Sequence, residues 1–75
     1  MINENLDPSL PLENARWEKF CQNLMIGMSN GEAYQGAGYN IKNIDGASVN
    51  ANVLLKNTKI ANRIAYLKKG KLNRS

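Results

Sequence analysis

The chain has 75 residues, enough for one small domain, and it carries a formal net charge of +4 with no histidine and a single cysteine. Without histidine neither a Ser–His–Asp triad nor a Cys–His pair can form, and one cysteine cannot make an internal disulfide. No spaced pair of carboxylates, no zinc-binding cluster and no glycine-rich phosphate loop replaces these groups. We therefore expect a protein that is not an enzyme and that binds no metal ion or other cofactor.

The N-terminal stretch MINENLDPSL lacks the basic and apolar segments of a secretory signal peptide. No apolar run approaches the roughly 20 residues that a membrane-spanning helix needs. These two features predict a cytoplasmic protein without a membrane partner.

Acidic and basic residues are divided unevenly between the two halves of the chain. Residues 1–41 contain two basic and five acidic residues, whereas residues 42–75 contain eight basic and one acidic residue. A positive field on one part of a small domain is typical of a surface that contacts a polyanion such as nucleic acid. Small domains without such a partner can also carry uneven charge, so the charge alone does not define a function.

The first 26 residues predict an arm followed by a helix. Residues 1–11 contain two X-Pro dipeptides and are expected to form a flexible arm, with Leu10 or Leu12 packed on the core. A helix is predicted from Leu12 to about Ile26, and Gly27 is suited to end it. Its apolar stripe has helical spacing and consists of Trp17, Phe20, Cys21, Leu24, Met25 and Met28. The polar side is expected to hold Arg16, Glu18, Lys19, Gln22 and Asn23.

A second, short helix is predicted from Asn30 to about Ala37. The sequence Ser29-Asn30-Gly31-Glu32 matches the S-x-x-E capping box, in which a hydroxyl and a carboxylate satisfy exposed backbone amides. Gly31 and Gly36 each cost up to about 1 kcal/mol of helix propensity relative to alanine. Gly38 is expected to end the helix, and Tyr39 to anchor the following turn in the core.

The third helix is predicted from Gly46 to Lys56, with Asp45 as its N-cap. A period of about 3.6 residues directs toward the core Ala47, Ala51, Leu54 and Leu55. The outward face is expected to hold Val49, Asn52, Val53 and Lys56, flanked by Ser48 and Asn50. Exposed valines are unusual on such a polar face, and they either meet a neighbouring helix or contact another molecule.

The fourth helix is predicted to be capped by Asn57 or Thr58 and to run to about Lys69, where Gly70 stops it. Its core stripe consists of Ile60, Ile64 and Leu67. Residues 70–75 are expected to form a basic tail or the start of a linker. No segment shows the alternating pattern of a strand, so the sequence predicts an all-α fold, a small bundle of three to four helices.

The second and third helices, with a glycine-containing turn between them, fit a helix-turn-helix unit, and we expect residues 12–69 to form a DNA-binding domain of this kind. In such units the second helix enters the major groove of double-stranded DNA. Asparagine can pair there with adenine, lysine with guanine, and an apolar side chain can touch the thymine methyl group. The candidates for base contacts are therefore Ser48, Val49, Asn52 and Lys56. The candidates for phosphate contacts are Lys42, Asn43, Lys59, Arg63, Lys68 and Lys69.

An ordered set of motifs adds a resemblance to a known family. The set runs through Phe20, Ser29, Ala33, Ala37-Gly38-Tyr39, Ala51, Leu54-Leu55-Lys56-Asn57, Ile60 and Arg63-Ile64. It resembles the N-terminal domain of bacteriophage terminase small subunits over roughly residues 17–67. The resemblance implies a helix-turn-helix domain of a phage or prophage protein that recognises viral DNA for packaging and delivers it to the large subunit, which holds the ATPase and nuclease.

The resemblance also implies two kinds of partner, namely other copies of the protein and the terminase large subunit. The family's oligomerisation region and its segment for the large subunit are missing here, so we expect either a fragment or a stripped-down protein. In its full-length form the protein is expected to be a homo-oligomer. Two departures from the family pattern stand out. The connector between Tyr39 and Leu54 is longer than usual, and Gly31 and Gly36 replace helix-favouring residues.

Two other functions fit the same sequence features. A helix-turn-helix transcriptional regulator would bind DNA by the same physics in a different biological role. Alternatively, the valine-bearing face of the third helix could dock on another helix, in a protein-interaction module that does not bind DNA.

Overall fold

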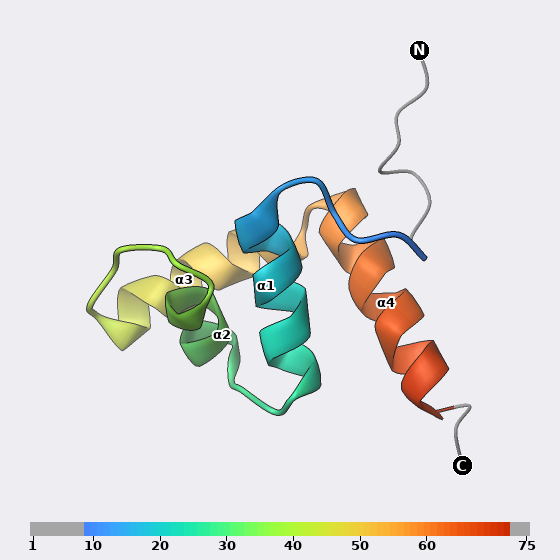
Figure 1. Ribbon diagram of the computed structural model, residues 1–75. Coiled ribbons are helices and arrows are strands. Elements are labelled where there is room, and N and C mark those ends of the chain that lie inside the picture. Colours follow the sequence, from blue (N-terminus) through green and yellow to red (C-terminus); the bar gives the residue numbers. More distant parts are fainter. Residues whose placement is uncertain (1–8, 73–75) are drawn as a thin grey trace.

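The computed structural model describes residues 9–72, with side chains to residue 69, and within this range the chain forms four α-helices and no strand (Figure 1). The helices are α1 (Ala15–Met25), α2 (Asn30–Gly36), α3 (Ile44–Leu55) and α4 (Thr58–Leu72). The predicted all-α fold class is confirmed. In Figure 1, α1 lies between the α2–α3 pair and α4, and α2 packs most extensively on α3. Most of the predicted N-terminal arm (1–8) and the end of the predicted tail (73–75) lie outside the described residues.

Helix α1 begins later than the sequence pattern predicts, because Asn14 is its N-cap. The Asn14 side chain accepts hydrogen bonds from the backbone amides of Arg16 (3.0 Å) and Trp17 (3.2 Å). Leu12 precedes the helix and is buried in the core, while Leu10 is exposed. The predicted end of α1 is confirmed, since Gly27 adopts a positive φ of 101° directly after the C-cap residue.

Both ends of α2 follow from local sequence signals, as predicted. The Glu32 amide donates to Ser29 Oγ (3.3 Å), and the Ser29 amide donates to Glu32 Oε1 (3.1 Å), so the capping box is complete. After the helix, Gly38 takes a positive φ of 104°, which residues with a Cβ adopt only at a cost. The connector to α3 then spans residues 37–43.

Helix α3 begins earlier than predicted, and the assignment of Asp45 as its N-cap is wrong. Asn43 is the cap, and its side chain accepts a hydrogen bond from the Asp45 amide at 2.8 Å. Asp45 instead lies in the first turn, where a carboxylate interacts favourably with the helix dipole. The earlier start places Ile44 against α2, next to the backbone of Gly31, and so extends the contact between the two helices.

Helix α4 is capped by Asn57, whose side chain accepts hydrogen bonds from the amides of Lys59 (2.9 Å) and Ile60 (3.4 Å). The prediction that Gly70 stops this helix is wrong, because α4 continues to Leu72. A glycine inside a helix costs about 1 kcal/mol relative to alanine, but it does not end the helix unless the chain also turns away there.

The core is formed where small residues let the helices approach one another closely. Phe20, Cys21 and Ile60 are its largest fully buried side chains. Three alanines on α2 and α3 are also fully buried, namely Ala33, Ala47 and Ala51. A Cβ added at Gly31 would lie 2.6 Å from Ser48 Oγ, closer than atoms can approach without a shift. Gly31 therefore allows close packing of α2 on α3 and is not merely a weak point of α2.

The prediction that Asn23 lies on the polar side of α1 is wrong, because this residue is buried. Its side chain is only 2% exposed, and its Nδ2 donates to the backbone oxygen of Ala33 at 3.1 Å. The hydrogen bond satisfies a buried polar group and connects α1 to α2. Helical spacing alone cannot reveal such a partner, because the partner is a backbone carbonyl on another element.

Candidate nucleic-acid interface

The outward face of α3 is exposed as predicted. Val49 and Val53 are 63% and 62% exposed, and Asn52 and Lys56 are exposed beside them. On the opposite side of the helix Ala47 and Ala51 are fully buried. We call Val49, Asn52, Val53 and Lys56 the α3 stripe. They have the spacing of one helix face, and about 10 Å along the axis separates the first from the last.

Ser48 does not belong to this stripe, although the sequence pattern made it a candidate for base contacts. The Ser48 side chain is half-buried. A Cβ added at Gly31 would lie only 2.6 Å from its Oγ. The hydroxyl therefore packs in the contact between α2 and α3. Because the side chain turns inward toward Gly31, its placement does not favour the predicted base contact by Ser48.

The connector 37–43 is held against α2 and fixes the N-terminal end of α3. Gln35 Nε2 donates to the backbone oxygens of Ile41 and Lys42, each at 3.2 Å. At the start of the connector the rings of Tyr34 and Tyr39 stack, with centroids 4.1 Å apart and an interplanar angle of 5°. These contacts anchor Tyr39, as expected. They also pack the connector into the structure, although it is longer than the turn of the simplest helix-turn-helix.

The two candidate phosphate contacts in this connector, Lys42 and Asn43, are both exposed. Lys42 is exposed just before α3. The side-chain oxygen of Asn43 is already engaged in capping the helix. A phosphate contact would use the side-chain amide nitrogen of Asn43, which the cap does not engage, so both residues stay candidates.

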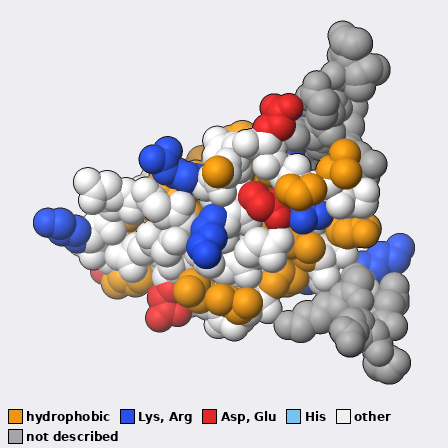
Figure 2. Space-filling view, viewed as in Figure 1, with side chains coloured by type: hydrophobic (Ala, Val, Ile, Leu, Met, Phe, Trp, Pro, Cys, Tyr) orange, Lys and Arg blue, Asp and Glu red, His pale blue; other side chains and the backbone are white. Residues whose placement is uncertain are grey.

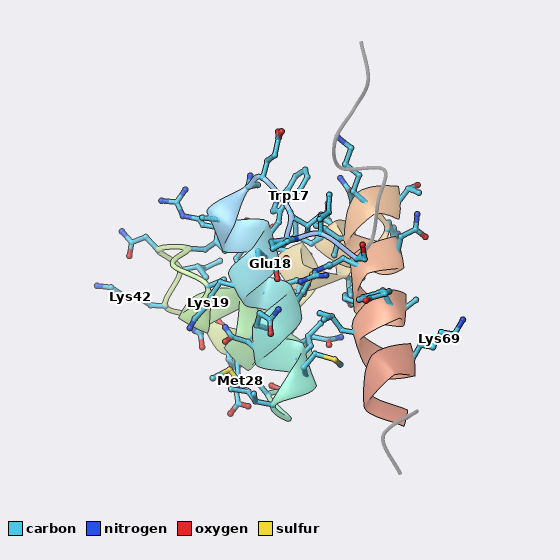
Figure 3. All side chains as sticks on the ribbon, turned by 45° about the vertical axis from the view of Figure 1, so that its right-hand side comes forward. Trp17, Glu18, Lys19, Met28, Lys42 and Lys69 are labelled. Atoms are coloured by element: carbon cyan, nitrogen blue, oxygen red, sulfur yellow. The ribbon has the colours of Figure 1, made fainter. Side chains whose placement is uncertain are left out.

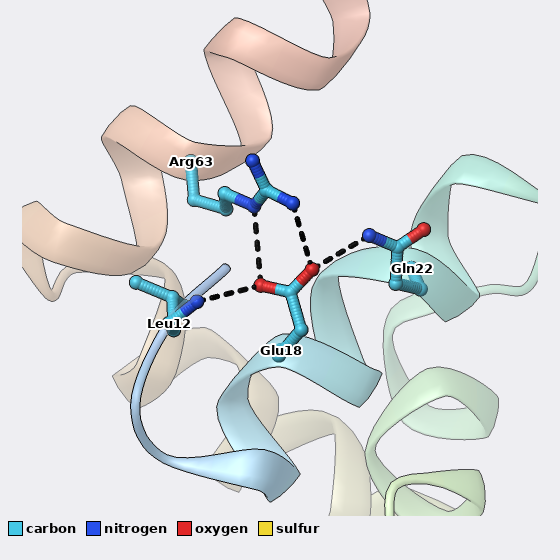
Figure 4. Close-up of polar contacts among 4 residues, drawn as sticks. All are labelled: Leu12, Glu18, Gln22 and Arg63. Carbon is cyan, nitrogen blue, oxygen red and sulfur yellow. Dashed lines mark hydrogen bonds and ion pairs between the residues drawn. The ribbon is translucent and has the colours of Figure 1, made fainter. Parts of the chain in front are cut away.

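Arg63 is not on the surface, and this placement does not favour the predicted phosphate contact. The residue is only 6% exposed and forms a bidentate ion pair with Glu18, shown in Figure 4. Its Nε donates to Glu18 Oε1 (3.1 Å) and its Nη2 to Glu18 Oε2 (2.9 Å). The guanidinium also lies 5.9 Å from the ring centroid of Tyr66. This cation therefore neutralises an internal carboxylate.

Burial and hydrogen bonding act in opposite directions on Glu18. Burial alone would raise its pKa, but hydrogen bonds from Arg63, the Leu12 amide and Gln22, together with the charge of Arg63, hold the pKa of this carboxyl below its ordinary value. By contrast, burial, reinforced by the nearby Glu18 charge, raises the pKa of the Cys21 thiol to about 11. A protonated, buried thiol is a packing group and not a nucleophile.

The remaining candidate cations are spread over three places and form no single basic patch. Lys42 precedes α3, Lys56 and Lys59 lie at the α3–α4 junction, and Lys68 and Lys69 are exposed toward the end of α4. Figure 3 shows Lys42 and Lys69 at opposite edges of the molecule. On the face seen in Figure 2, uncharged and acidic side chains separate the Lys and Arg side chains. Of these candidates, Lys42 and Lys59 flank the α3 stripe, which itself includes Lys56.

The described part of the chain shows neither a metal site nor a membrane-spanning helix. No group of three or more His, Cys, Asp and Glu side chains is placed to hold a metal ion among residues 9–69. None of the helices within 9–72 is long and apolar enough to cross a membrane.

Comparisons with known protein families, with curated proteins and with solved structures find no match to this chain. The function is therefore argued from the α3 stripe and its surroundings.

Proposed function

We propose that this domain binds double-stranded DNA with α3 in the major groove. The observation that carries the proposal is the α3 stripe, an amide and two apolar side chains exposed on the second helix of a closely packed pair. Amide and methyl groups complement base edges, and Lys42, Lys56 and Lys59 at the two ends of α3 are suited to phosphates. A helix of 12 residues is about 18 Å long, a length that the major groove accommodates.

The motif resemblance supports a specific role for this binding. As the N-terminal domain of a phage or prophage terminase small subunit, the chain recognises viral DNA for packaging in the cytoplasm of the bacterial host. Other parts of a full-length homo-oligomer then deliver the DNA to the large subunit. A helix-turn-helix transcriptional regulator is the alternative role, and a neighbouring gene for a large packaging ATPase would favour the terminase.

The isolated domain is expected to bind DNA weakly. Few lysines flank the stripe, and non-specific contacts of this kind give dissociation constants of about 1 μM or weaker at physiological salt. Display of several domains on one oligomer raises the effective affinity by orders of magnitude without new contacts. Weak, salt-sensitive binding by the single domain is therefore the expected result.

A matched pair of charge reversals tests the proposal. Lys56→Glu places a negative charge on the stripe, whereas Lys19→Glu makes the same change on exposed α1. In fluorescence anisotropy titrations with a labelled duplex, we expect Lys56→Glu to weaken binding at least about tenfold, and Lys19→Glu much less. Circular dichroism checks that both variants fold. Equal effects of the two changes, or binding that salt does not weaken, would contradict the proposal.

The exposure of Val49 and Val53 favours a second candidate function, a protein-interaction module. More than half of each side chain faces solvent, and two valines one turn apart form a seam for another helix. Sedimentation velocity over a range of concentrations separates the two functions. Self-association that Val49→Asp or Val53→Asp abolishes, in a domain that binds no DNA, would favour the interaction module.

A further inference from the structure

Apart from Lys56, the α3 stripe consists of one amide and two apolar side chains. Its base-facing part consists of Val49, Asn52 and Val53, and no arginine lies on α3. Arginine is the side chain that most commonly reads guanine. Lys56 is the C-cap residue, beyond the last helical position, and is better placed for a phosphate at the edge of the groove. The N-terminal end of the same face holds the exposed carboxylate of Asp45, which repels phosphates. The base contacts are therefore expected from Val49 onward, C-terminal to Asp45 on this face.

Each of these groups matches an A·T pair better than a G·C pair. Thymine is the base that presents a methyl group in the major groove, and valine offers it an apolar partner with little rotamer freedom to lose. The asparagine amide supplies one donor and one acceptor, which match N7 and the N6 amino group of adenine. Guanine presents two acceptors at the same positions, so the amide oxygen would face another acceptor. A valine placed on cytosine would cover the N4 donor without satisfying it.

We propose that α3 specifies a short block of A·T pairs, with Val49 and Val53 on thymine methyl groups and Asn52 on an adenine. The two valines are one helical turn apart, about 6 Å along the axis, which corresponds to about two base-pair steps of roughly 3.4 Å. The block therefore covers about three to four pairs. This inference rests on the proposed function, since it names the sequence class that the same surface reads.

Replacing thymine by deoxyuridine tests the methyl contacts directly, because the replacement removes the methyl group and keeps the pairing. Three duplexes of equal length are compared at one low salt concentration: alternating d(AT), alternating d(GC), and alternating d(AU). We expect the d(AT) duplex to bind at least about tenfold more tightly than d(GC). We expect deoxyuridine to remove about tenfold of affinity, as the loss of two buried methyl contacts would.

Variants assign the effect to the stripe. Val49→Ala with Val53→Ala should bind d(AT) and d(AU) equally. By contrast, Ile26→Ala, at an exposed apolar residue after α1, should keep the difference. A second substitution, 7-deazaadenine for adenine, should weaken binding by the parent chain and not by Asn52→Ala. Circular dichroism confirms that each variant folds.

The possible failures are distinguishable. Equal binding of d(AT) and d(AU) by the parent chain, with salt-sensitive binding retained, would overturn the A·T reading and leave DNA binding in place. Tighter binding to d(GC) would do the same. Absence of binding to all three duplexes would overturn both this inference and the proposed function.

Discussion

Glu18 connects three segments of the chain through its two carboxylate oxygens. Oε1 accepts from the Leu12 amide (3.0 Å) and from Arg63, and Oε2 accepts from Gln22 Nε2 (2.7 Å) and from Arg63. The segment before α1, α1 itself and α4 therefore meet at one charged group (Figure 4). A partly buried carboxylate with this many donors is stabilised in its ionised form.

Removing the arginine should destabilise the fold and not merely weaken binding. Arg63→Gln leaves the Glu18 carboxylate without its counter-ion, and we expect a loss of about 2–3 kcal/mol in the free energy of unfolding. Lys19→Gln, on the exposed side of α1, should change it by less than about 0.5 kcal/mol. Urea unfolding followed by circular dichroism measures both. If Arg63→Gln unfolded at the parent's urea midpoint and lost DNA affinity, Arg63 would be a DNA contact after all.

The Glu18 network also predicts a loss of stability in acid. Its pKa in the folded chain is lowered, so the ionised carboxylate stabilises the fold fully above the ordinary glutamate pKa of about 4.5. That contribution is lost progressively as the pH falls below about 5 toward the lowered folded pKa. Urea midpoints measured from neutral pH into this window should fall for the parent chain. They should fall less steeply for Glu18→Gln, and a parallel fall in the two proteins would refute the assignment.

At the scale of elements, the contact between α2 and α3 determines where the α3 stripe points. Gly31 lets the helices approach, because a Cβ there would lie 2.8 Å from Ile44 Cδ1 and 3.1 Å from the backbone oxygen of Ile44. We expect Gly31→Ala to cost about 1–3 kcal/mol through overpacking, even though alanine gains up to about 1 kcal/mol of helix propensity.

Gly46→Ala is the matched control for this change. Its added Cβ would lie 3.3 Å from the movable end of the Ile41 side chain, so we expect unchanged or slightly greater stability. Thermal unfolding followed by circular dichroism compares the two variants. Equal stability of Gly31→Ala and the parent chain would contradict the close packing of α2 on α3 at Gly31.

Local signals in the sequence predicted the helices well because each signal and its partner lie within a few residues. The capping box of Ser29 and Glu32 and the positive φ of Gly27 and Gly38 are of this kind. The start of α3 was predicted wrongly because Asn43 and Asp45 are both good N-caps. Packing of Ile44 on α2, which is not local, distinguishes them.

The candidate interface was predicted less completely, for a related reason. Helical periodicity correctly placed Val49 and Val53 on the exposed face of α3. It could not show that Arg63 has a partner on α1, or that Ser48 turns toward Gly31, since both depend on which helices lie side by side. Opposite charges on Glu18 and Arg63 were visible in the sequence, 45 positions apart, but many other pairs of charges were equally compatible with it.

At the scale of the whole molecule, the arrangement of helices divides the described basic residues of the C-terminal half into separate groups. Arg63 is buried, and Lys68 and Lys69 lie about 15 Å along α4 from its start, beyond the α3–α4 junction. Lys69 projects from the outer side of α4 in Figure 3. Among the described residues, fewer cations therefore lie beside α3 than the excess of basic residues in the sequence suggests.

This division predicts a modest salt dependence of DNA binding. Each neutralised phosphate contributes about −0.9 to the slope of log K against log salt concentration. Contacts from Lys42, Lys56 and Lys59 alone should give a slope of about −2.7, so affinity should fall about 40-fold between about 50 and 200 mM salt. Participation of Lys68 and Lys69 would steepen the slope to about −4.5.

Titrations of the parent chain and two variants over this range of salt decide between these arrangements. We expect Lys68→Gln with Lys69→Gln to leave the slope at about −2.7, and Lys56→Gln to reduce its magnitude by about 1. The comparison is internal, because each lysine loses its charge by the same substitution. A slope reduced by the α4 pair and unchanged by Lys56→Gln would place the duplex along α4, and would require a binding mode in which α3 does not enter the groove.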